Sequence, residues 1–150
     1  QSLAKVTLHL VFSTKNRIPF LSDADLRRQL YAYMATILRD NVGSPALVVN
    51  GTDDHVHVLA RMGRTITIAK VVEEAKTETS KWLKRQSHGL ADFAWQAGYG
   101  VFSVSESMIP KVRRYVAEQE RHHERMTFQN ELRALCRRHG VEIDERYVWE

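Results

Sequence analysis

Residues 53–59 read DDHVHVL, and the alternation of histidine with valine over residues 55–58 is typical of a β-strand. Side chains alternate between the two faces of a strand. His55 and His57 are therefore expected on one face, with Val56 on the other face toward a core. Two neighbouring imidazoles can bind one divalent metal ion. Two half-exposed histidines on a sheet face are the alternative, and partners elsewhere in the chain decide between these two interpretations.

The segments around this strand predict the order of the other elements. The expected strands are residues 4–13, 46–50, 54–62 and 100–104, and the second and third are expected to pair antiparallel. The expected helices are 23–41 after a cap at Ser22 or Asp23, one that begins at Thr65 or Thr67, 106–122, and 127–139. This order is the ferredoxin-like split βαβ pattern, an α+β fold in which an antiparallel sheet carries helices on one face and further helices follow at the C-terminus.

Composition bounds the class of protein. The chain has 150 residues, 43% of them hydrophobic, which predicts a single domain over residues 1–150 with a continuous core. It has no run of about 18 apolar residues and its first residues already alternate as a strand, so we expect neither a membrane span nor a secretory signal. One cysteine, Cys136, fits a cytoplasmic protein without disulfides. The net charge of +4 suits an enzyme with one basic face for nucleic acid.

A second group of polar residues lies on the expected helix 106–122. Tyr115 and Gln119 are four residues apart and therefore project from the same face of that helix. The buried stripe of the helix is formed by Ile109, Val112 and Val116, so Tyr115 can also be a tyrosine that packs at the edge of the core. Gln119 is an unusual choice for an apolar seam, and its amide oxygen can bind a hard cation or accept a hydrogen bond.

Five stretches, in order and spread over nearly the whole chain, resemble the small single-tyrosine transposases of the insertion-sequence 200/605 type. They are LHLVFSTKNR (residues 8–17), HVH (55–57), WQAGYGVFSVS (95–105), YVAEQERHH (115–123) and DERYVW (144–149). A histidine pair around one bulky residue is the HUH signature of that superfamily. Together the five stretches are far more specific than the histidine pair alone.

The resemblance implies a set of roles for the site residues. His55, His57 and Gln119 would bind a divalent metal ion, Mg²⁺ or Mn²⁺, and Tyr115 would be the nucleophile. The implied enzyme is a DNA transposase, a single-strand endonuclease and strand transferase that works through a 5′-phosphotyrosine intermediate. Its implied partners are single-stranded DNA with hairpins and a second copy of the chain, in a homodimer whose tyrosine helix acts in trans. Such an enzyme would act in the bacterial or archaeal cytoplasm, at the nucleoid.

Binding of single-stranded DNA requires a cationic groove. The candidate residues are Lys15, Arg17, Lys81, Lys84, Arg85, Arg113, Arg114 and Arg121, although a solvated surface charge is the simpler explanation for each one taken alone. His123, one turn after Gln119, can contact phosphate or support the metal site, but a solvated helix end is the simpler expectation. Asp54 can orient an imidazole or serve only the turn, and Tyr99 is the rival nucleophile.

Three other functions remain open at this level. The chain can be a domesticated relative that nicks repeated palindromes without transposing. It can be a non-catalytic nucleic-acid-binding module on a ferredoxin-like sheet, although the histidine strand offers no aromatic residues for base stacking. It can also be a small metallohydrolase that uses activated water, which would not require Tyr115.

Overall fold

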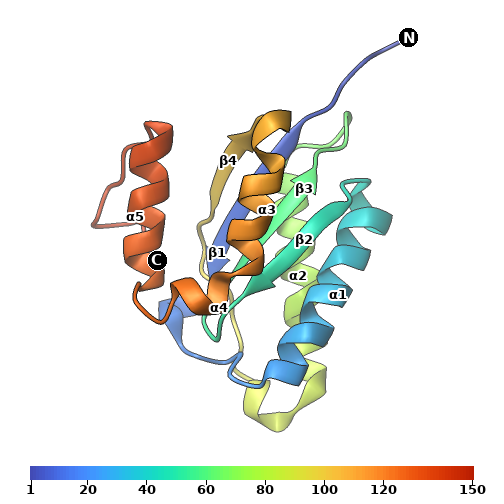
Figure 1. Cartoon of the computed structure of the whole chain (residues 1–150). Helices are drawn as coiled ribbons and strands as arrows, with labels where there is room; N and C mark the ends of the chain where they lie inside the picture. The colour runs from blue at the N-terminus through green and yellow to red at the C-terminus, as the bar shows by residue number, and fades with distance from the viewer.

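The computed structural model describes residues 1–150 and contains one four-stranded antiparallel sheet (Figure 1). Its strands are β1 (Thr7–Ser13), β2 (Ala46–Gly51), β3 (His55–Arg61) and β4 (Gly100–Val104), in the spatial order β2-β3-β1-β4. β3 pairs antiparallel with both β2 and β1, so the histidine strand is a central strand. This order confirms the ferredoxin-like α+β prediction. The first strand begins at Thr7 rather than at residue 4.

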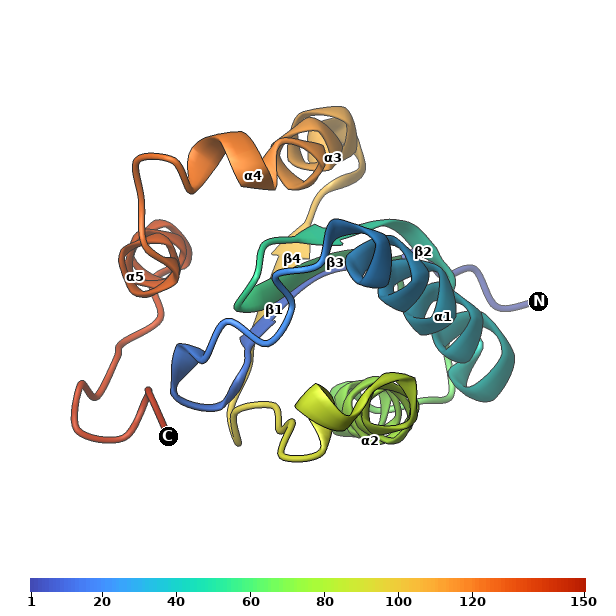
Figure 2. The same ribbon diagram turned by 90° about the horizontal axis from the view of Figure 1, so that it is seen from below.

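Two long helices cover one face of the sheet. They are α1 (Ala24–Val42) and α2 (Ile68–Gln86), and Figure 2 shows α2 beneath the sheet. The carboxylate of Asp23 caps α1 by accepting hydrogen bonds from the backbone of Asp25 and Leu26. Gly43 ends α1 in the left-handed conformation at φ 56°. Thr67 caps α2, which settles the choice left open between Thr65 and Thr67.

The main core lies between this helical layer and the sheet. Alternate residues of β1 and β3 face it, and they are Leu8, Leu10, Phe12, Val56, Val58 and Ala60. Trp95, in the segment before β4, is buried in the same core, where its ring packs edge-on against Phe12 and Phe93. None of the helices is both long and apolar enough to cross a lipid bilayer.

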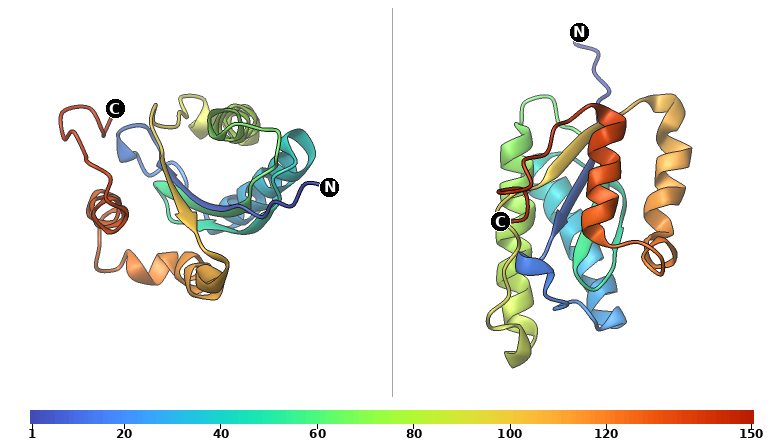
Figure 3. Two further views of the ribbon diagram at one scale, coloured as in Figure 1. Left: turned by 90° about the horizontal axis from the view of Figure 1, so that it is seen from above. Right: turned by 90° about the vertical axis from the view of Figure 1, so that its left-hand side faces the viewer.

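The C-terminal helices cover the opposite face of the sheet (Figure 3). They are α3 (Ile109–Ala117), the short α4 (Gln119–His122) and α5 (Phe128–His139). A second apolar cluster fixes α5 to this face through Val11 of β1, Phe102 of β4 and the α5 residues Phe128, Leu132, Leu135 and Cys136. β1 is therefore buried along its whole length, because helices pack on both of its faces.

One expected helix is divided in the structure. Residues 106–108 form a 3₁₀ turn, and the continuous helix predicted over 106–122 is wrong because the chain breaks at Glu118, which has φ −102° and ψ 22°. The amide of Glu118 donates to the carbonyls of both Arg114 and Tyr115, so the last turn of α3 tightens. Further 3₁₀ turns lie at Lys15–Arg17 and His88–Leu90.

Candidate active site

The histidines of β3 lie side by side on the face covered by the C-terminal helices. Both side chains are fully buried, at 0% exposure, and Val56 between them points into the main core. Gly51, the last residue of β2, leaves no room for a side chain, because a Cβ there would collide with the carbonyl oxygen of His55. The predicted orientation of the two imidazoles is confirmed, but they are buried rather than half-exposed.

Each imidazole of the pair is held through its Nδ1 atom. His57 Nδ1 lies 2.7 Å from Nε2 of His9, which comes from the neighbouring strand β1. His55 Nδ1 lies 2.7 Å from an oxygen of Asp54 and 2.9 Å from the hydroxyl of Thr52. These contacts leave both Nε2 atoms facing the space between β3 and the C-terminal helices. Fixing one ring nitrogen in this way is how proteins orient metal-binding histidines.

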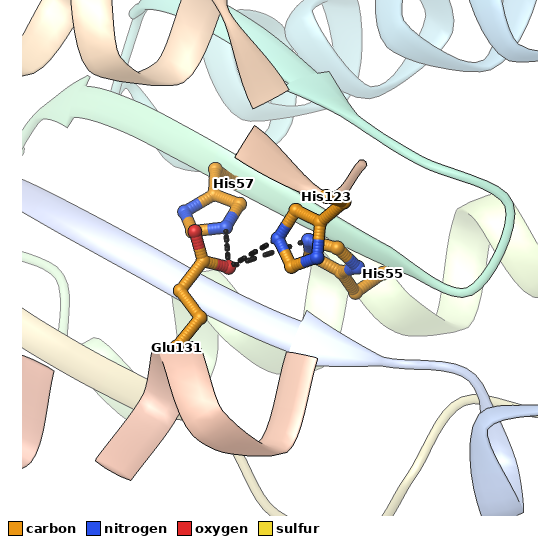
Figure 4. Close-up of side chains that lie close together, drawn as sticks. All are labelled: His55, His57, His123 and Glu131. Carbon is orange, nitrogen blue, oxygen red and sulfur yellow. Dashed lines mark hydrogen bonds and ion pairs between the residues drawn. The ribbon is translucent and has the colours of Figure 1, made fainter. Parts of the chain in front are cut away.

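Glu131 of α5 occupies the centre of this space (Figure 4). Its Oε1 atom lies 2.8 Å from Nε2 of His57, 2.9 Å from Nε2 of His123 and 3.4 Å from Nε2 of His55. The residue is only 1% exposed. One carboxylate oxygen is thus surrounded by three imidazoles, two from the sheet and one from the segment after α4.

Tyr115 and Gln119 meet the same carboxylate on its other oxygen. The hydroxyl of Tyr115 donates to Oε2 of Glu131, and Nε2 of Gln119 donates to that atom at 3.1 Å. The amide oxygen of Gln119 lies 3.1 Å from Nε2 of His55. The Tyr115 ring is 5.9 Å from the ring of His57. The structure therefore brings together all four residues predicted for the metal and the nucleophile, within one chain.

Three site residues go beyond what the sequence predicted. His9 and Glu131 were not predicted from the sequence. His123, for which a solvated helix end was the simpler expectation, contacts Glu131 instead. A signal for Glu131 exists, because it lies on the apolar stripe of α5 with Phe128 and Leu135. A carboxylate at such a position is rarely buried without a partner. His9 is likewise a polar residue within a strand that is buried throughout.

A family profile described as "Transposase IS200 like" matches residues 2–119. The chain belongs to the IS200-like transposase family. The match covers the sheet, α1, α2, α3 and the first residue of α4, and it ends before α5. No curated protein matches the chain at a significant level.

Two solved structures share the fold of this IS200-like transposase. One is a crystal structure of a provisionally assigned transposase from Deinococcus radiodurans R1, with a TM-score of 0.55 and 22% identity over 79% of this chain and 93% of that chain. The other is a REP-associated tyrosine transposase bound to a REP hairpin, with a TM-score of 0.55 and 13% identity over 79% of this chain and 67% of that chain. Both agree with the α+β fold described above.

The electrostatics of this candidate site centre on Glu131. Burial opposes ionisation of this carboxyl, but hydrogen bonds from His123, His55 and His57 outweigh burial and hold its pKa far below the usual range. Burial and the adjacent Glu131 carboxylate raise the pKa of the Tyr115 phenol above its ordinary value. The phenol is therefore protonated at neutral pH in the metal-free protein, and its proton points at a carboxylate oxygen.

The pKa values of the buried imidazoles shift in different directions. Burial lowers the pKa of His9 to about 3 and that of His57 to about 4, so both rings are neutral. Burial also acts against protonation of His55, but its contacts with Asp54 and Glu131 prevail and raise its pKa to about 9. The imidazolium of His55 thus faces the Glu131 carboxylate in the metal-free protein.

The donor atoms of this site suit a divalent ion. Ligand atoms of His55, His57, His123 and Glu131 all lie within 4.8 Å of one another. Imidazole nitrogens bind transition metals, whereas carboxylate and amide oxygens bind Mg²⁺ and Mn²⁺. The oriented Nε2 atoms, the buried carboxylate and the amide oxygen of Gln119 are chemically appropriate for such an ion.

The predicted DNA-binding cations fall into three groups. Lys81, Lys84 and Arg85 are exposed on α2, across the sheet from the histidines. Arg113, Arg114 and Arg121 are exposed on α3 and α4, on the same side as the site. Lys15 is exposed on the turn after β1, whereas Arg17 is partly engaged, donating to the carbonyl of Trp149 at 3.1 Å. The structure therefore separates the α2 cations from the site.

A cleft of about 640 Å³ lies between β4, α3 and α5 and gives access to Tyr115. Tyr115 and His9 line it, together with Lys111 of α3 and Arg138 of α5. The sequence-based candidates did not include these two cations. They place positive charge beside Tyr115.

Proposed function

We propose that this chain is a DNA transposase that cleaves and rejoins single-stranded DNA at hairpin-flanked ends through a 5′-phosphotyrosine at Tyr115. The observation that supports this most is the meeting of the Tyr115 hydroxyl with the Nε2 side of His55 and His57 around one buried carboxylate. Neither a core tyrosine nor a metallohydrolase needs a phenol aimed at a cluster of metal-binding side chains. Membership of the IS200-like family supports the same reaction class.

His55, His57 and Gln119 would hold the divalent ion, Mg²⁺ or Mn²⁺. When bound, the ion would withdraw charge from the scissile phosphodiester. Side chains of the protein carry out the remaining steps. The phenol oxygen of Tyr115 attacks phosphorus, and the bond from phosphorus to the 3′ oxygen breaks. That oxygen takes a proton from water as it leaves and becomes a 3′-hydroxyl. Oε2 of Glu131 is the nearest acceptor for the phenol proton. Attack by another 3′-hydroxyl on the phosphotyrosine reverses the exchange and rejoins DNA.

Hairpin-bearing DNA is the proposed substrate. A neighbour with the same fold is bound to a REP hairpin, which supports this class of ligand for the present chain. The exposed Arg113, Arg114 and Arg121 lie on the side of the sheet that carries the site, and Lys111 and Arg138 border the cleft. We propose that the strand to be cut follows these cations to Tyr115, in the cytoplasm where such DNA occurs.

The decisive experiment is the trapping of a covalent adduct. A labelled single strand with a hairpin is incubated with the protein and Mn²⁺ or Mg²⁺, and the product is resolved under denaturing conditions and weighed by mass spectrometry. We expect an adduct at Tyr115 that is absent in Tyr115→Phe and retained in Tyr99→Phe, the exposed rival tyrosine. Cleavage without an adduct by Tyr115→Phe would instead indicate an activated-water hydrolase. Hairpin binding with no cleavage by the wild type would indicate a binding module.

The proposed homodimer can be tested with two inactive variants. In the structure Tyr115 meets the histidines of its own chain, so an active site in cis needs no partner. Mixing His57→Ala with Tyr115→Phe would restore adduct formation only if the tyrosine helix is exchanged between chains. Activity in the mixture supports the predicted arrangement in trans, and its absence supports the arrangement in cis.

A further inference from the structure

Glu131 carries a buried negative charge that no lysine or arginine neutralises. Its hydrogen-bond and ion-pair partners are the imidazoles of His55, His57 and His123, the Tyr115 hydroxyl and the Gln119 amide. Burying an ionised carboxylate is costly unless a cation compensates it. In the metal-free protein only an imidazolium can supply that charge. A divalent ion bound by the same imidazoles would supply it without a proton.

The geometry also matches a shared ion. Neighbouring ligands of Mg²⁺ or Mn²⁺, each about 2.1 Å from the ion at right angles, lie about 3 Å apart. Oε1 of Glu131 is 2.8 Å from Nε2 of His57 and 3.4 Å from Nε2 of His55. The amide oxygen of Gln119 is 3.1 Å from Nε2 of His55. These separations are those expected for adjacent ligands of one ion.

We propose that Glu131 is a fourth protein ligand of the divalent ion, so that the ion fixes α5 to the histidine strand. The inference deepens the proposed function, on which it rests for the identity of the ion. Four protein ligands leave two positions of an octahedral site for water and a phosphate oxygen. His123, at 2.9 Å from Oε1, positions the carboxylate. Glu131 lies beyond the residues that the family profile matches.

Metal binding without DNA tests this role. Mn²⁺ is titrated into the purified 150-residue chain, and free Mn²⁺ is followed by electron paramagnetic resonance. We expect Glu131→Gln, which keeps the shape of the side chain, to weaken Mn²⁺ binding by at least about tenfold. Glu142→Gln removes an exposed carboxylate in the segment after α5 and is the matched control, with unchanged affinity. Glu131→Asp retains a carboxylate and should keep part of the affinity.

A second measurement reports on α5 itself. Backbone hydrogen exchange in the Phe128–His139 helix should slow when Mn²⁺ binds the wild type and should not respond in Glu131→Gln. Affinity within about twofold of the wild type, or tighter binding by Glu131→Gln, would overturn the proposal, because the carboxylate would then be a bystander or a competitor. These outcomes are independent of the tyrosine adduct. A protein that binds Mn²⁺ through Glu131 yet forms no adduct refutes the proposed function and leaves the ligand assignment standing.

Discussion

The contact between Tyr115 and Glu131 should contribute measurably to stability. Tyr115 is half-buried and donates its hydroxyl to a carboxylate that is 1% exposed. Hydrogen bonds to charged groups contribute about 1.5–3 kcal/mol, and the partial exposure of the tyrosine favours the lower end of that range. For a domain of this size, about 1.5 kcal/mol corresponds to a Tm shift of about 3–6 °C. Tyr115→Phe should therefore melt about 3–6 °C below the wild type in the presence of EDTA.

The assay is thermal unfolding followed by circular dichroism and calorimetry. Tyr147→Phe is the matched control, because Tyr147 is 59% exposed and contacts the guanidinium of Arg146 rather than a buried carboxylate. A Tm for Tyr115→Phe within about 1 °C of both the control and the wild type would refute the reasoning, since the phenol would then not be docked on Glu131 in solution. If the contact forms within one chain, the Tm should also be independent of protein concentration.

Three further predictions concern buried groups. His9→Ala removes the support of His57 Nδ1 and should weaken Mn²⁺ binding by about 10- to 100-fold in a calorimetric titration. Because burial lowers the pKa of His9 to about 3, only the unfolded chain gains its proton below about pH 6.5, so native stability is lost as the pH falls. Urea unfolding in EDTA should show that the free energy of unfolding falls between about pH 7 and 5. In His9→Asn this fall should be smaller by about 2 kcal/mol. Tyr31→Phe removes a buried hydroxyl that has no hydrogen-bond partner, so its unfolding free energy should stay within about 0.5 kcal/mol of the wild type or rise; a loss above about 2 kcal/mol would contradict this.

Local periodicity was sufficient to predict much of the fold. The alternation over residues 55–58 placed His55 and His57 on one face and Val56 in the core. Caps at Asp23 and Thr67 marked the starts of two helices. The division of the helix at Glu118 was not predicted, because the helical spacing of Val112 and Val116 continues to Gln119 and no glycine or proline marks the break. Its consequence is small, since Tyr115 and Gln119 both still reach Glu131.

The positions of the predicted DNA-binding cations likewise could not be obtained from local sequence. Lys81, Lys84 and Arg85 have the charge and exposure that DNA binding requires, and nothing in their own segment shows which face of the sheet α2 covers. Helix packing decides this, because the apolar side of α2 joins the core on the face opposite the histidines. Lys111 and Arg138 were overlooked because the cleft that they line is formed by three separate elements.

The sequence by itself determined the succession of strands and helices, the orientation of the two imidazoles and the spacing of Tyr115 and Gln119, because each depends on residues that are neighbours along one element. Only the tertiary structure decided that Glu131, 74 residues from His57, enters the site, and that His9 and His123 join it. No periodic pattern encodes these contacts. They arise because α5 docks through Phe128, Leu132 and Leu135 against the sheet, which carries the one carboxylate on that stripe into the group of imidazoles.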